Sequence, residues 1–200
     1  MNEREASIAA VVLAAGASTR LGKPKQLIEM EGESLLRRTA RLALEAGCAP
    51  VFVVVGFEAE RMRAELQGVD ATALTNEQWA KGMGSSLRRG MEAVCAMETH
   101  PAGVLLLVCD QPQLTADHLR KLLAEQGADE EAITASEYAG RAGVPAVFGR
   151  RYFAELLAVE GDRGAREVVQ RHTDRIRTVL WPEGERDLDR PEDLEALERA

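Results

Sequence analysis

Residues 8–25 read Ile8-Ala9-Ala10-Val11-Val12-Leu13-Ala14-Ala15-Gly16-Ala17-Ser18-Thr19-Arg20-Leu21-Gly22-Lys23-Pro24-Lys25, an apolar run followed by small and then basic residues. The apolar part, residues 8–13, predicts a buried strand. Small residues let a ligand approach the backbone, glycines reach unusual backbone angles, and consecutive N–H groups can surround an anion. Arg20, Lys23 and Lys25 add positive charge nearby. We therefore expect a site for a triphosphate at the end of the first strand.

The spacing in this loop excludes two well-known phosphate-binding motifs. A Walker-type loop has four residues between its glycines, followed by Gly-Lys and a Ser or Thr. Here five residues separate Gly16 from Gly22, and Pro24 occupies the hydroxyl position. The three spaced glycines of the dinucleotide fingerprint are also missing. On residue chemistry alone, an ordinary connection between a strand and a helix remains the alternative.

The composition predicts one globular domain over residues 1–200 with a mostly aliphatic core, because the chain is 46% hydrophobic but only 4% aromatic. The net charge of −8 argues against a nucleic-acid polymer or an anionic membrane surface as partner. No apolar run is long enough to span a membrane, and the N-terminus lacks a secretory signal. The three cysteines, Cys48, Cys95 and Cys109, lack metal-site spacing, so we expect buried thiols in a reducing cytoplasm.

Short aliphatic runs alternate with longer stretches of helical spacing along the whole chain. Runs that are apolar throughout are typical of parallel strands buried on both faces by helices. We therefore predict an α/β protein with a three-layer α/β/α Rossmann-like fold and a mostly parallel central sheet. Such sheets bind ligands beyond the carboxyl ends of their strands, which places the loop after residue 13 at the site. The expected strands are residues 8–13, 51–55, 72–75, 104–108 and 133–135, with later candidates at 144–148 and 176–180. The expected helices are residues 35–46, residues 59–66, and one each after Ser85-Ser86 and Thr115.

A carboxylate follows the apolar run of residues 104–108, in the sequence Cys109-Asp110-Gln111-Pro112. This position puts Asp110 at the same edge of the sheet as the basic loop. Mg²⁺ prefers a few carboxylates together with substrate phosphates, so Asp110 is a candidate metal ligand. The alternative is a turn-forming aspartate, because Asp-x-Pro sequences make good turns.

A second acidic group, Asp187-Leu188-Asp189-Arg190-Pro191-Glu192-Asp193, lies near the end of the chain. Pro191, Glu192 and Asp193 suit the first turn of a helix. The residues alone allow two roles for Asp189, as the N-cap of that helix or as a second metal ligand.

The loop of residues 76–86 carries two glycines and two serines before a helix, which suits an anion or a polar ring. Ser85 is a candidate ligand-binding residue and equally a good N-cap. Trp79 either stacks on a ligand or covers the core, and we favour the core.

Together these segments resemble the nucleotidyltransferases related to molybdenum-cofactor guanylyl- and cytidylyltransferases. The resemblance covers nearly the whole chain and begins with the signature loop Leu13-Ala14-Ala15-Gly16-x-Ser18-x-Arg20-Leu21-Gly22-x-x-Lys25. Leu21 replaces the usual Met, and Arg190 replaces the usual Thr. The motifs similar to the cytidylyltransferase branch are Asn76-x-x-Trp79-x-x-Gly82-Met83-x-Ser85-Ser86-Leu87, Asp110-Gln111-Pro112, Gly143-Val144-Pro145, Gly161-Asp162-x-Gly164-Ala165-Arg166 and Asp187-Leu188-Asp189-x-Pro191-Glu192-Asp193.

The resemblance implies a fold of the nucleotide-diphospho-sugar transferase type, a nucleoside triphosphate substrate and Mg²⁺. Leu-Ala-Ala-Gly tends to accompany CTP and Leu-Ala-Gly-Gly tends to accompany GTP, so Ala15 favours CTP. The family's metal ligands fall on Asp110 and Asp189, and Lys25 and Arg20 join Asp110 as catalytic residues. The implied nucleotide-binding residues are Leu13, Ala14, Ala15, Gly16, Ser18, Arg20, Lys25, Ser85 and Asp110.

The implied reaction transfers CMP to the terminal phosphate of molybdopterin and releases pyrophosphate. The product would pass to another protein, a molybdoenzyme or its chaperone. Two alternatives stay open: a nucleotidyltransferase of the same fold with another triphosphate or a sugar phosphate as acceptor, and a nucleotide-binding module without turnover.

Overall fold

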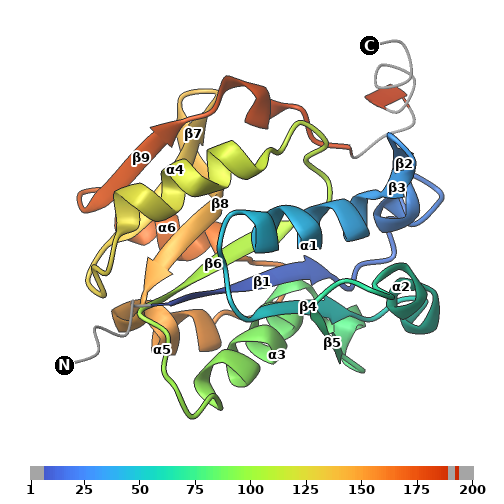
Figure 1. Cartoon of the computed structure of the whole chain (residues 1–200), viewed down its shortest axis with the longest axis horizontal. Helices are drawn as coiled ribbons and strands as arrows, with labels where there is room; N and C mark the ends of the chain where they lie inside the picture. Colours follow the sequence, from blue (N-terminus) through green and yellow to red (C-terminus); the bar gives the residue numbers. More distant parts are fainter. Residues whose placement is uncertain (1–6, 189–191, 194–200) are drawn as a thin grey trace.

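The computed structural model describes residues 7–188 and 192–193, which form a twisted sheet between two layers of helices (Figure 1). The sheet has seven strands in the order β5-β4-β1-β6-β8-β7-β9. A separate two-stranded hairpin follows the signature loop, formed by β2 (Glu29–Met30) and β3 (Glu33–Ser34). The strands of the large sheet are β1 (Ile8–Ala14), β4 (Val51–Val55), β5 (Thr72–Thr75), β6 (Gly103–Val108), β7 (Ile133–Tyr138), β8 (Arg141–Gly149) and β9 (Ile176–Leu180).

The strand pairing confirms the mostly parallel sheet predicted from the sequence. The pairs β1–β4, β1–β6, β4–β5 and β7–β9 are parallel, whereas β8 is antiparallel to both β6 and β7. The exception has a local cause, because only Ala139 and Gly140 connect β7 to β8. A two-residue connection can join antiparallel neighbours but not parallel ones.

Helices cover both faces of the sheet. One face carries α1 (Leu35–Glu45), α2 (Ala59–Glu65) and α4 (Ala116–Gln126), and the other carries α3 (Met83–Cys95), α5 (Phe153–Leu157) and α6 (Arg166–Arg171). Strand β1 serves both layers, since Ala10 and Val12 pack into the first core and Ala9 and Val11 into the second. The described residues also include four short 3₁₀ segments, η1 (Lys25–Leu27), η2 (Trp79–Lys81), η3 (Arg150–Tyr152) and η4 (Pro182–Glu185).

One helix starts where the sequence predicts it, directly after Thr115, and another starts earlier than predicted. Thr115 caps α4, and its side chain accepts a hydrogen bond from the His118 N–H. Helix α3 begins at Met83 with Gly82 as N-cap, so the prediction that Ser85 caps this helix is wrong. Gly82 has a φ of 101°, and a Cβ there would lie 2.5 Å from the Gly161 carbonyl oxygen. Only glycine tolerates both the positive φ and this close contact. The helix therefore begins after Gly82, before the two serines.

The cysteines only partly follow the prediction. Cys48 and Cys109 are buried, but Cys95 is exposed at the end of α3. Within residues 7–188 and 192–193, no helix combines the length and the apolar character needed to cross a bilayer.

The strand order decides where a ligand can enter. Strand β1 lies between β4 and β6, and Leu13 of β1 pairs with Val108 of β6. The carboxyl ends of these two parallel strands therefore meet at one edge of the sheet. From β1 the chain continues to β4 on one side, whereas β6 lies on the other side. Crevices of this kind bind ligands in open α/β sheets.

Candidate active site

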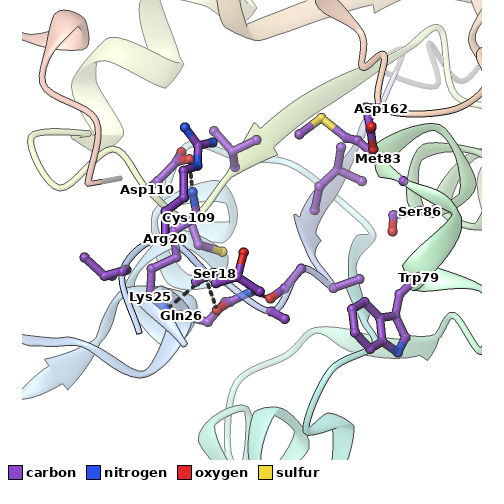
Figure 2. Close-up of a pocket in the computed structure, with 18 of the residues that line it drawn as sticks. Ser18, Arg20, Lys25, Gln26, Trp79, Met83, Ser86, Cys109, Asp110 and Asp162 are labelled. Carbon is purple, nitrogen blue, oxygen red and sulfur yellow. Dashed lines mark hydrogen bonds and ion pairs between the residues drawn. The ribbon is translucent and has the colours of Figure 1, made fainter. Parts of the chain in front are cut away.

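A pocket of about 620 Å³ opens beyond the carboxyl ends of β1 and β6. Figure 2 shows that its walls come from segments far apart in the sequence. One wall is the signature loop, which we define as residues 13–25, together with Asp110 at the end of β6. The opposite wall consists of the segment around η2 and the start of α3, with Asp162 beside it.

Lys25 and Asp110 meet at one side of this pocket (Figure 2). Lys25 is the first residue of η1, and Asp110 follows β6. The Lys25 ammonium forms an ion pair with the Asp110 carboxylate, and their side chains are 22% and 18% exposed. A cation and an anion 85 residues apart thus occupy one cleft. The sequence predicts this, because one follows the loop after β1 and the other follows β6. Their roles toward a ligand stay predictions.

The other predicted binding residues divide into two groups. Leu13, Ala15, Gly16, Ser18 and Arg20 line the pocket.

Ala14 and Ser85 are not among the lining residues; Ser86 lines the pocket instead of Ser85. The Ser85 hydroxyl donates to the Gly82 carbonyl oxygen at 2.8 Å and accepts from the Asn76 amide at 2.9 Å. The structure therefore gives Ser85 a role in holding the wall, and a contact with the nucleotide stays a prediction.

The backbone of the signature loop bends at Ser18 and Gly22, which have φ angles of 52° and 75°. Gly16, the glycine that the sequence singled out with Gly22, does not have a positive φ. The Ser18 carbonyl oxygen accepts from the Leu21 N–H at 3.0 Å, and the Ser18 hydroxyl oxygen accepts from the Lys25 N–H at 3.2 Å. These bonds fold the loop into a compact turn that carries Lys25 toward Asp110.

The loop is also anchored by a small apolar cluster. Leu21 packs with Ile28, Leu35 and Leu188, all of them buried. The Leu188 N–H donates to the Asp110 carbonyl oxygen at 2.8 Å. The C-terminal segment thus reaches the pocket at Leu188, the last described residue before Asp189, which lies outside the described residues.

The opposite wall offers flat and polar surfaces to a ligand. Trp79 is half-buried, meets the Phe57 ring edge to face at a centroid distance of 5.6 Å, and also lines the pocket. It therefore covers part of the core, as favoured above, and leaves part of its ring exposed to a ligand. Asn76 is buried and its side-chain amide donates to the Ser86 hydroxyl at 3.0 Å, which orients this wall.

The donor chemistry fits a magnesium ion that arrives with its substrate. Asp110 supplies a partly exposed carboxylate at the pocket wall. The described part of the chain contains no group of three or more metal-ligating side chains that would form a protein-only metal site. Mg²⁺ is usually held by one or two carboxylates plus substrate phosphates, so this donor set suits it.

Cys109 is the one thiol that lines the pocket among the described residues. Burial, with the neighbouring Asp110 carboxylate, raises the pKa of Cys109 to about 12. The thiol is protonated at neutral pH and is a poor nucleophile. The chemistry available here is therefore charge stabilisation and positioning.

Sequence reasoning missed Gln26, which is buried, lies at the pocket lining and bonds to the backbone of the signature loop. The only feature of the sequence that could have indicated Gln26 is its position directly after Lys25. Its burial depends on the 3₁₀ turn of η1, which the sequence does not predict.

Residues 10–176 match the family described as MobA-like NTP transferase domain. The purine catabolism protein PucB of Bacillus subtilis is 29% identical over 204 residues, which covers 95% of each chain. A probable molybdenum cofactor guanylyltransferase of Nostoc sp. is 28% identical over 197 residues, covering 96% of this chain and 91% of the relative. The crystal structure of Rv0371c from Mycobacterium tuberculosis gives a TM-score of 0.82 at 30% identity and covers 98% of this chain and 100% of Rv0371c. Rv0371c has also been solved in complex with manganese. The signature loop, the Lys25–Asp110 pocket and these matches together show that the chain belongs to the MobA-like NTP transferase family and is a nucleotidyltransferase.

Proposed function

We propose that this nucleotidyltransferase transfers CMP from CTP to the terminal phosphate of molybdopterin and releases pyrophosphate. The observation that carries the proposal is the convergence of the signature loop, Lys25 and Asp110 in one pocket at the carboxyl ends of β1 and β6. Support for CTP comes from Ala15, which lines this pocket where the guanylyl branch tends to have glycine.

The reaction needs no general base from the protein. A phosphate monoester is already anionic, so one of its oxygens attacks the α-phosphorus directly. The bond from the α-phosphorus to the bridging oxygen breaks, and pyrophosphate leaves with that electron pair. Catalysis then consists of positioning the two substrates and stabilising charge on the α-phosphate and the leaving group.

The chain's own charges are arranged for that task. Lys25 and Arg20 would contact the triphosphate, since both line the pocket on the side of the signature loop. Asp110 would hold Mg²⁺ together with phosphate oxygens, and the bound ion would supply positive charge against the triphosphate. Asp189 is the proposed second ligand, supported by the bond that places Leu188 against Asp110.

A GTP-dependent reaction is the second candidate, because one relative is named a probable molybdenum cofactor guanylyltransferase. The base would lie against the wall formed by Trp79, Met83 and Ser86. Contacts with this wall would distinguish a pyrimidine from a purine.

The test is the rate of pyrophosphate release with CTP, GTP, ATP or UTP, each with and without molybdopterin. We expect release that requires both CTP and molybdopterin. Release only with GTP and molybdopterin would establish the second candidate, and turnover only with a sugar 1-phosphate would replace molybdopterin as acceptor. Binding of CTP without product from any acceptor would refute catalysis. A molybdoenzyme or its chaperone is the proposed recipient of the product.

A further inference from the structure

Gln26 is a buried polar side chain that the proposed chemistry does not use. It lies in η1 next to Lys25, and only 2% of its surface is exposed. Burying an amide costs free energy unless its hydrogen-bonding groups find partners. The partners of Gln26 therefore indicate what its burial accomplishes.

Those partners all belong to the signature loop, and two of them are backbone carbonyl groups. The Gln26 side-chain amide donates to the Ala14 carbonyl oxygen at 2.9 Å and to the Gly16 carbonyl oxygen at 2.8 Å. The Ser18 hydroxyl donates to the Gln26 amide oxygen over 3.5 Å. One side chain thus fixes the orientation of two peptide groups directly after β1.

The orientation of these peptides has a consequence on their other side. In a planar trans peptide the C=O of one residue and the N–H of the next point in opposite directions. When the Ala14 and Gly16 carbonyls point to Gln26, the Ala15 and Ala17 N–H groups point away from it. Ala15 and Ala17 both line the pocket, and neither N–H has a hydrogen-bond acceptor within residues 7–188 and 192–193.

We propose that Gln26 is a positioning residue that aims the Ala15 and Ala17 N–H groups at the bound nucleotide. This inference rests on the proposed function, because it takes the pocket to hold a nucleoside triphosphate. Successive N–H groups held toward one side of a loop bind anionic or carbonyl oxygens. Because their direction is set before the ligand arrives, binding does not have to reorganise the loop.

The chain offers a matched control at the opposite edge of the sheet. Gln126 is 1% exposed, and its amide donates to the carbonyl oxygens of Asp129 at 2.5 Å and Ala132 at 3.2 Å. It lies at the end of α4, near the start of β7 and away from the pocket. Gln26 and Gln126 therefore have the same burial and the same type of bonds, but only one of them holds the signature loop.

The first experiment compares Gln26→Met with Gln126→Met. Methionine keeps the approximate length of the side chain and removes both donor hydrogens. We expect both variants to lose thermal stability, but Gln26→Met alone to raise the Kd for Mg-CTP and Mg-GTP by about tenfold, the loss of one good hydrogen bond to the ligand. Unchanged binding by folded Gln26→Met, or an equal loss in Gln126→Met, would overturn the inference.

Gln26→Glu adds a readout that a purely structural role would not move. An ionised carboxylate only accepts hydrogen bonds and repels the two carbonyls, whereas a protonated carboxyl can donate to one of them. Burial raises the pKa of such a group, so the Kd ratio of Gln26→Glu to the unaltered protein should fall from about pH 8 to about pH 6. A ratio independent of pH would contradict the inference.

A measurement on the unaltered protein keeps the inference testable if the variants fail to fold. The Ala15 and Ala17 amide resonances should shift on saturation with Mg-CTP or Mg-GTP in a ¹⁵N–¹H spectrum. Saturation without movement of either resonance would overturn the role of Gln26 and leave the proposed function intact. Absence of binding by all four triphosphates would instead refute the proposed function.

Discussion

The ion pair between Lys25 and Asp110 makes a prediction about the order in which ligands bind. In the absence of ligand the lysine that would contact phosphate lies against the carboxylate that would hold the metal. A metal ion arriving alone must compete with the Lys25 ammonium. A triphosphate arriving with the metal can attract that ammonium and release Asp110. We therefore expect Lys25→Met to bind Mn²⁺ more tightly than the unaltered protein when no nucleotide is present.

The magnitude follows from the geometry of the pair. Two unit charges ~4 Å apart interact by about 4 kcal/mol at an effective dielectric constant of ~20. The two side chains are 22% and 18% exposed. Solvent screening and desolvation therefore reduce the net value to about 1–2 kcal/mol. A change of 1.4 kcal/mol is tenfold in affinity, so the Kd for Mn²⁺ should fall by roughly tenfold.

The assay is a titration with Mn²⁺ followed by electron paramagnetic resonance or calorimetry. Lys23→Met is the matched control, because Lys23 lies in the same loop, is exposed and does not line the pocket. Lys25→Met should also weaken CTP binding, since a cation for the triphosphate is lost. Unchanged or weaker Mn²⁺ binding in Lys25→Met, or an equal gain in Lys23→Met, would refute the reasoning.

Three further predictions concern single side chains. Asp110→Asn should lower the rate of pyrophosphate release by roughly a hundredfold, about 3 kcal/mol of barrier. Its urea unfolding should stay cooperative, with a loss of stability of no more than about 1–2 kcal/mol from the missing ion pair with Lys25. Full Mg²⁺-dependent release would show that Asp110 is not a catalytic residue. Burial lowers the pKa of His118 to about 4 from 6.5. The unfolded chain therefore binds a proton that the folded chain does not, and the free energy of unfolding should fall by about 2–3 kcal/mol as pH drops from 6.5 to 4. His118→Phe should flatten that part of the unfolding profile, and an unaltered slope would contradict the assignment. Iodoacetamide should modify exposed Cys95 in the native protein and spare Cys109, whose pKa burial raises to about 12; mass spectrometry showing early labelling of Cys109 would disprove its burial.

The layered fold followed from the sequence because its signals are local. Uniformly apolar runs such as residues 51–55 predict strands covered on both faces, and β4 has those bounds. The expected parallel arrangement was enough to bring the basic loop and Asp110 to the same edge of the sheet, although the strand order itself was not predicted. The direction of β8 was not predicted, because the expected strands 133–135 and 144–148 left a long connection, whereas β7 and β8 extend to Tyr138 and Arg141 and leave only two residues between them.

Details of the walls required contacts between distant segments. The sequence alone favoured Ser85 as a cap or a ligand, but the close approach of Gly161 to Gly82 moves the helix start and leaves Ser86 facing the pocket. A sequence motif does not distinguish the two neighbouring serine hydroxyls. They point in different directions only once the helix has fixed their side chains.

By itself, the sequence determined a loop of small and basic residues after a buried strand, the acid at the end of a neighbouring strand and the α/β layering. Each of these depends on residue type and short-range spacing. The tertiary structure alone decided that Lys25 and Asp110 form an ion pair, that Leu188 lies against Asp110 and that Gln26 orients the loop. These contacts join residues whose separation along the chain carries no periodic signal, and only the folded backbone brings their polar groups within hydrogen-bonding distance.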